Sequence, residues 1–181
     1  LLAHSRLIND CTDLAVIIDA HCHILPPSFR DRRDEIAQRD ATFAALLADP
    51  NSRLATAEDL IAAMDRDGVD RAVVMGMGWT DLEIAKEVND YIIQAVADKP
   101  TRLSGFGSVN PVWGEAAYAE GKRCIAAGLI GIGELHADSQ DFDITDVAAM
   151  SPVMELTRSE HLPVLIHASE PVGHQYPGKG T

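Results

Sequence analysis

The sequence predicts an α/β fold built from repeated βα units, and three observations support this prediction. Short apolar runs alternate with longer amphipathic segments along the 181 residues. After the first unit, successive apolar runs start roughly 30 residues apart, which is about the length of one βα unit. Residue types that bind metals follow several of these runs, at the strand ends where barrel enzymes keep their active sites. We therefore predict a (β/α)8 TIM-type barrel, represented here only by about its first five βα units.

The predicted strands are nearly all apolar, which is typical of a parallel sheet covered by helices. They span residues 16–19, 72–75, 103–109, 129–134 and 164–167. A longer stretch separates the first strand from the second and has room for an inserted segment from Ser28 to Pro50. No G-x-G-x-x-G motif follows the first strand, so the sequence does not indicate the dinucleotide site of an open doubly wound sheet.

Helices are predicted between the strands from apolar spacing and from the residues at their ends. Thr56 and Asp59 are spaced for a capping box, and Gly68 fits a left-handed helix stop. Between residues 82 and 96, apolar side chains recur at intervals of three and four, and residues 115–127 form the next predicted helix.

A fourth helix is predicted to begin at Ser151 and Pro152. Serine is a favoured N-cap, and proline is tolerated in the first turn because its missing N–H would have no partner there. Pro163 prevents this helix from continuing into the next strand.

Composition and charge exclude several classes of function. With 46% hydrophobic and 24% charged residues the chain resembles a soluble globular domain, and no apolar run approaches the ~20 residues of a membrane span. The 15 basic and 28 acidic residues give a net charge of −13, which argues against nucleic acid or an anionic membrane as a partner. The three cysteines form no C-x-x-C motif, which favours a cytoplasmic location.

His21 and His23 form the most informative motif of the sequence. Side chains alternate along a strand, so both imidazoles point to one face and Cys22 to the other. Two imidazoles about 6–7 Å apart along a strand can chelate one divalent ion. The alternative is a pair of partly buried histidines with ordinary hydrogen bonds, but the position at a strand end favours metal binding.

Two later strands end in residues of the same kinds. The fourth ends with Glu134 and His136, which share a face, and the fifth ends with His167. Because nitrogen and oxygen donors converge from three strand ends, we predict a metal site in which His21, His23 and His167 bind one divalent ion. Glu134 is predicted to face the same site, where it either binds a second ion or holds a ligand in place. A packed, hydrogen-bonded histidine is the preferred interpretation of His136, which we leave out of the predicted ligand set.

These residues resemble the amidohydrolase superfamily. The similarity rests on residues 18–23 (IDAHCH) and on residues 167–174 (HASEPVGH), and it looks closest to the amidohydrolase-related (amidohydrolase 2) family of TIM-barrel metal-dependent hydrolases. The resemblance implies a distorted barrel that binds one or two divalent ions, most often zinc, through His21, His23 and His167. Glu134 is similar to the fourth-strand carboxylate of a deoxyribonuclease-type branch of this superfamily.

The resemblance also implies residues that the sequence does not contain. The family pattern continues with a His after the sixth strand and with a general-base Asp after the eighth strand, which we expect to lie beyond Thr181. We therefore expect residues 1–181 to form a single hydrolase-type barrel domain truncated after strand five. Completion would come from further chain or from a homo-oligomer, and the segment alone would lack full catalytic competence.

The resemblance implies a metal-dependent hydrolase whose metal-bound hydroxide acts on a small polar amide, ester or lactone. The alternatives are a metal-dependent decarboxylase of the same family and a catalytically inactive fragment that binds a metal or a partner. His174, Tyr176 and Lys179 are candidate substrate-binding residues, because loops at this face of a barrel carry specificity. A metal-free mechanism through Ser169 is disfavoured, since no G-x-S-x-G motif surrounds it.

Overall fold

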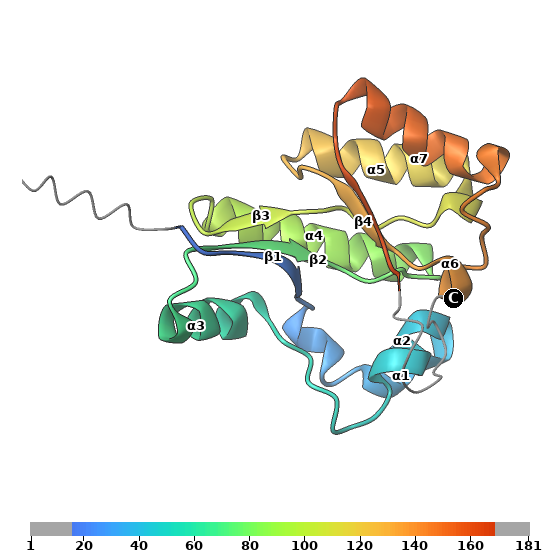
Figure 1. Ribbon diagram of the computed structural model, residues 1–181. Coiled ribbons are helices and arrows are strands. Elements are labelled where there is room, and N and C mark those ends of the chain that lie inside the picture. The colour runs from blue at the N-terminus through green and yellow to red at the C-terminus, as the bar shows by residue number, and fades with distance from the viewer. Residues whose placement is uncertain (1–15, 169–181) are drawn as a thin grey trace, which may run out of the picture.

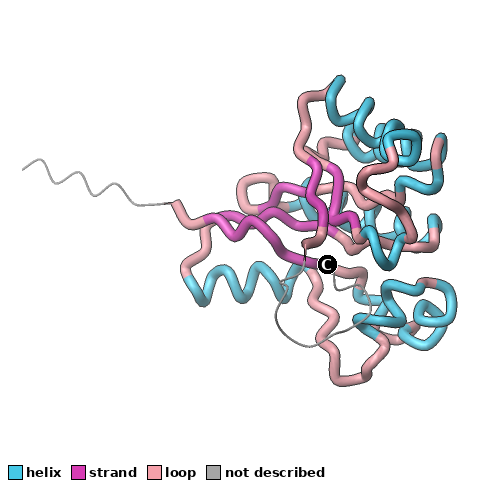
Figure 2. The backbone as a smooth tube through the Cα atoms, turned by 45° about the vertical axis from the view of Figure 1, so that its right-hand side comes forward, coloured by secondary structure: helices cyan, strands magenta, loops and turns pink. Residues whose placement is uncertain are grey.

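The computed structural model describes residues 16–168, and five parallel strands form its centre (Figures 1 and 2). The strands are β1 (Ile18–His23), β2 (Arg71–Met75), β3 (Leu103–Gly105), β4 (Ile132–Leu135) and β5 (Val164–Ile166). Strands β1, β2 and β3 pair in that order, β4 pairs with β5, and a bridge between Gly107 and Ile132 joins the two sheets. All pairings are parallel and follow chain order, as the predicted barrel requires.

The helices are α1 (Arg33–Arg39), α2 (Ala41–Leu47), α3 (Ala57–Asp67), α4 (Leu82–Asp98), α5 (Glu115–Ala126), α6 (Ala137–Gln140) and α7 (Val147–Ser159), with short 3-10 turns η1 (Pro27–Phe29) and η2 (Pro111–Trp113). Helix α4 packs against β2 and β3, whereas the two short helices α1 and α2 lie apart from the sheet, at the lower right of Figure 1. Helices α5 and α7 pack against each other beside β4 (Figure 1). No helix within residues 16–168 is long and apolar enough to cross a membrane.

The predicted helix ends of α3 are confirmed. The Thr56 hydroxyl accepts a hydrogen bond from the Asp59 N–H, and the Asp59 carboxylate accepts one from the Thr56 N–H, which completes the capping box. Gly68 ends the helix with φ of 73°, a left-handed conformation that glycine adopts without steric cost. Helices α4 and α5 also lie within a few residues of their predicted bounds.

The predicted start of the last helix is wrong. Helix α7 begins at Val147, where the Asp146 carboxylate accepts hydrogen bonds from two backbone N–H groups, and Pro152 lies inside the helix. The earlier start buries Met150, which packs in the core around β4. The strong N-cap and this burial add one turn before the proline, whose missing N–H leaves a single helical hydrogen bond unmade.

Strand β1 is longer than predicted, and this difference matters for the site. Pairing with β2 continues to Cys22 and His23, after an irregularity between Asp19 and Cys22. Both predicted metal-binding histidines lie within the strand, at its carboxyl end, as the predicted alternation requires. Strand β4 starts later than predicted, at Ile132, and ends at Leu135, so that Glu134 lies within the sheet.

The predicted insertion between β1 and β2 contains α1 and α2 and packs onto the loop that follows β2. Phe29 and Phe43 from the insertion contact the buried ring of Trp79. The buried Asp40 carboxylate accepts hydrogen bonds from the backbone N–H groups of Thr80 and Asp81. These contacts hold α2 beside the carboxyl ends of the strands.

Candidate metal centre

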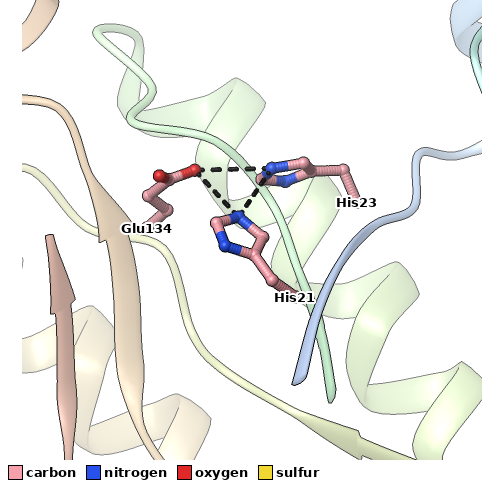
Figure 3. Close-up of side chains that lie close together, drawn as sticks. All are labelled: His21, His23 and Glu134. Carbon is pink, nitrogen blue, oxygen red and sulfur yellow. Dashed lines mark hydrogen bonds and ion pairs between the residues drawn. The ribbon is translucent and has the colours of Figure 1, made fainter. Parts of the chain in front are cut away.

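Strand β1 directs His21 and His23 to one point, as the alternation predicts. Their Nε2 atoms lie 3.0 Å apart, and the side chains point toward each other in Figure 3. Cys22, on the opposite face of the strand, packs in the hydrophobic core. Burial raises the pKa of the Cys22 thiol to about 12, so it is a neutral core residue and not a thiolate ligand.

Glu134 completes this group from the other sheet (Figure 3). Its Oε2 atom lies 3.3 Å from His21 Nε2 and 3.4 Å from His23 Nε2. Two donors bound about 2.1 Å from one ion lie about 3.0 Å apart at a right angle and about 3.4 Å apart at a tetrahedral angle. The three donor atoms therefore have the mutual spacing that a single divalent ion requires.

The hydrogen bonding of His23 favours a cation at the centre of this cluster. Its Nδ1 lies 3.1 Å from the carbonyl oxygen of Gly76, which follows β2. A carbonyl oxygen only accepts, so Nδ1 carries the hydrogen in this contact, and Nε2 faces Glu134 and His21. Without a proton, Nε2 presents a lone pair to them. A positive charge is needed between these atoms, and either a proton or a metal ion supplies it.

Two more histidines contact the same carboxylate. His136 Nε2 lies 3.4 Å from Oε2 of Glu134, and His167 Nδ1 lies 3.0 Å from Oε1. The rings of His136 and His167 are stacked, with centroids 4.1 Å apart. Glu134 thus belongs to two overlapping groups of three donors, one with His21 and His23 and one with His136 and His167.

The surroundings keep Glu134 ionised although its side chain is only 4% exposed. Burial by itself would raise the pKa of this carboxyl group, but hydrogen bonds from His136, His23 and His167 and the charge of His136 hold it far below its usual range. A buried carboxylate among imidazoles is therefore a preformed anionic centre for a cation.

An open pocket of about 260 Å³ leads to the cluster. The four histidines and Glu134 line it together with Leu46 from α2 and Met77 from the loop after β2. The inserted helix α2 thereby contributes one apolar side chain to the lining, and the histidines and Glu134 come from β1, β4 and the residues that follow β4 and β5.

The structure brings together all four predicted ligands, and it adds His136, which the sequence analysis left out. The shared face of Glu134 and His136 was the available signal, and the structure shows that both side chains point to the same centre. The Gly76 carbonyl could not be found from sequence, since any residue carries such a group. The predicted substrate-binding residues His174, Tyr176 and Lys179 lie outside the described residues.

Comparison with known proteins identifies relatives of this arrangement. The sequence profile of the Amidohydrolase family (amidohydrolase 2) matches residues 18–180. A 2-amino-3-carboxymuconate-6-semialdehyde decarboxylase from Dictyostelium discoideum is 27% identical over 180 residues, which cover 86% of this chain and 50% of that protein. The chain thus spans about half the length of the curated relative it matches.

Solved structures of similar fold include two 5-carboxyvanillate decarboxylases. The one from Sphingomonas paucimobilis superposes with a TM-score of 0.66 and 21% identity, covering 86% of this chain and 52% of that chain. A second, from Novosphingobium aromaticivorans, has a TM-score of 0.65 and 21% identity, covers 84% of this chain and 51% of that chain, and contains manganese and 3-methoxy-4-hydroxy-5-nitrobenzoic acid. The predicted fold is confirmed: this chain forms part of a barrel and corresponds to about half of each of these neighbours.

Proposed function

This chain belongs to the amidohydrolase family, and we propose that it is part of a metal-dependent decarboxylase of small carboxylic acids. The observation that carries the proposal is the convergence of His21 and His23 on one oxygen of the buried Glu134. A single arginine would be enough to satisfy one buried carboxylate, as Arg123 does for Glu120, so stability alone does not require four imidazoles around Glu134. Metal binding accounts for the cluster.

We infer that His21, His23, His167 and Glu134 hold one divalent ion. A bound divalent ion supplies positive charge that binds and polarises an anionic substrate. The nitrogen-rich donor set suits zinc, and manganese is the ion in the similar structure from Novosphingobium aromaticivorans. Binding and activity are therefore measured with both Mn²⁺ and Zn²⁺.

The apolar side of the pocket favours loss of CO2. Leu46 and Met77 are the apolar part of the wall of the pocket that contains the donor cluster. A carboxylate beside such a wall loses hydration, whereas the CO2 that leaves is uncharged, so the wall disfavours the reactant more than the product. The reaction breaks the bond from the carboxyl carbon to its neighbour, leaves the electron pair on the neighbour and adds one proton there.

Decarboxylation was the second interpretation of the sequence, after hydrolysis, and the comparisons favour it. The relatives described above are named as decarboxylases of unsaturated or aromatic acids. Hydrolysis by the same donor set remains the second candidate, because the family profile carries the name of a hydrolase.

The test is product analysis on the full-length protein loaded with Mn²⁺ or Zn²⁺. We expect CO2 release from an acid of the classes named for the relatives, such as 5-carboxyvanillate, and none from the metal-free protein or from Glu134→Gln. Hydrolysis of an amide, ester or lactone without CO2 release would favour the second candidate. Metal binding without any turnover would favour the inactive-fragment alternative.

A further inference from the structure

Gln140, the last residue of α6, carries a buried amide, and every polar atom of its side chain forms a hydrogen bond. Its Oε1 accepts a hydrogen bond from the backbone N–H of His136 at 2.8 Å. Its Nε2 donates to the carbonyl oxygens of Trp79 and Val109, at 3.0 and 2.9 Å. One side chain therefore ties the chain after β4 to the loops after β2 and β3, at the edge of the sheet where the site lies.

Gly78 approaches the same backbone closely. A Cβ atom at Gly78 would lie 2.6 Å from Cβ of His136 and 2.9 Å from Oε1 of Gln140, both closer than real side-chain contacts. The Gly78 carbonyl accepts a hydrogen bond from the buried Thr42 hydroxyl of α2, which keeps this loop in place. The main chain at His136 is thus hydrogen-bonded to Gln140 and packs closely against Gly78.

In the described part of the chain, the ring of His136 lacks the hydrogen bond to its second nitrogen that usually fixes a metal-binding histidine. Metal-binding histidines usually donate their second ring N–H to a carboxylate, carbonyl or water, which fixes the ring. Within residues 16–168, the buried Nδ1 of His136 has no hydrogen-bond partner. The ring stacks on His167, and its Nε2 faces Oε2 of Glu134 at 3.4 Å, on the same oxygen that His21 and His23 approach.

We propose that His136 is a further donor of the metal centre and that Gln140 is its positioning residue, acting through the main chain. The proposal rests on the proposed function, since the donor acts toward the bound ion. His23 is oriented by a hydrogen bond to its own ring, whereas His136 is oriented by a hydrogen bond to its backbone. Loss of the Gln140 amide should therefore weaken metal binding although Gln140 never approaches the ion.

The experiment measures the dissociation constant for Mn²⁺ by competition with a chelator, in the full-length protein. Gln140→Met keeps the volume of the side chain and removes its hydrogen bonds, and we expect the dissociation constant to rise about 10- to 100-fold, as for other partners of ligands. If Gln140→Met does not fold, Gln140→Glu replaces it. This variant keeps an acceptor for the His136 N–H and removes the hydrogen bonds to the carbonyls of Trp79 and Val109. Ile92→Val, in the core on α4, is the control that lowers the denaturation midpoint without changing the dissociation constant.

A double substitution separates positioning from general destabilisation. If Gln140 acts through His136, then His136→Ala alone and His136→Ala combined with Gln140→Met have the same dissociation constant. Additive losses would overturn the positioning role, and an unchanged constant in His136→Ala would overturn the donor role. The visible spectrum of the Co²⁺ form should change in Gln140→Met and stay unchanged in Ile92→Val.

Failure of the proposed function has a different signature. If the wild-type protein binds neither Mn²⁺ nor Zn²⁺, the proposed function and the donor role of His136 are both wrong. The positioning role is then decided by NMR of the histidine ring nitrogens in the metal-free protein. Gln140→Met should shift the signals of His136 and leave those of His21 unchanged, and unshifted His136 signals would overturn it.

Discussion

Two buried glutamates, Glu134 and Glu120, sit in opposite kinds of surroundings. The Glu134 side chain, 4% exposed on β4, faces imidazoles from three strand ends. The Glu120 side chain, 2% exposed on α5, contacts the guanidinium of Arg123 at 2.7 Å and the amide of Asn89 at 2.8 Å. Burial raises the pKa of both carboxyls, and in each the partners outweigh burial and lower it.

The two glutamates differ in whether their partners can release a proton. Arg123 is permanently charged and is held further by Asp90, so the charge of Glu120 is already neutralised and its neighbourhood only joins α4 to α5. The imidazoles around Glu134 can give up a proton in exchange for a metal ion, which a guanidinium cannot do. Burial of a carboxylate alone therefore does not indicate a site, whereas exchangeable partners do.

The largest effect that separates the two is expected from Glu134→Gln. The amide removes the anionic donor shared by the two groups of ligands, so affinity for Mn²⁺ should fall by more than the roughly 10–100-fold that an indirect partner contributes. Isothermal titration with Mn²⁺ and Zn²⁺ measures this loss. Retention of wild-type affinity would show that Glu134 is not a ligand.

A comparison within β1 should give nearly as large a contrast. His21→Ala removes a donor and should abolish stoichiometric metal binding, as measured by elemental analysis after dialysis. Cys22→Ala, one residue away on the opposite face, should leave the metal content unchanged and lower stability by roughly 1 kcal/mol through lost packing. Equal metal loss in both variants would contradict the opposite orientations of the His21 and Cys22 side chains.

The matching substitution at the other glutamate should affect folding alone. Glu120→Gln removes a charge-assisted contact with Arg123 and disturbs the bond from Asn89, at a cost of about 1–3 kcal/mol in unfolding free energy. Urea denaturation measures this cost, and titration with Mn²⁺ should give the wild-type dissociation constant. A weakened metal site in Glu120→Gln would mean that the two regions are coupled.

The smallest expected effect is the pH dependence of the unfolding free energy that Glu120→Gln loses. The pKa of Glu120 is lower in the folded protein than in the unfolded chain, so its stabilisation is fully present above the ordinary glutamate range near ~4.3. It is lost progressively as the pH falls below that range toward the folded pKa. The stability difference between wild type and Glu120→Gln should therefore shrink between about pH 5 and pH 3, and a constant difference would contradict the assignment.

Local patterns were sufficient for most of the fold and for part of the site. Alternation along β1 predicted that His21 and His23 share a face, and the capping box at Thr56 and Asp59 predicted the start of α3, because both depend on residues within one turn or one strand. The same local logic failed at Pro152. There the N-cap at Asp146 and the burial of Met150 outweighed a favourable Ser-Pro start.

The sequence by itself determined a parallel α/β barrel type and the residue types of a metal site at its strand ends, because periodicity and chain order are encoded locally. Only the tertiary structure decided that Oε2 of Glu134 lies within 3.4 Å of three imidazoles, that His136 is among them, and that Gln140 holds its backbone. These distances join residues on separate strands, and they depend on strand register, on the close approach at Gly78 and on backbone carbonyls. Carbonyl groups occur at every position, so no pattern of side chains marks the ones that matter.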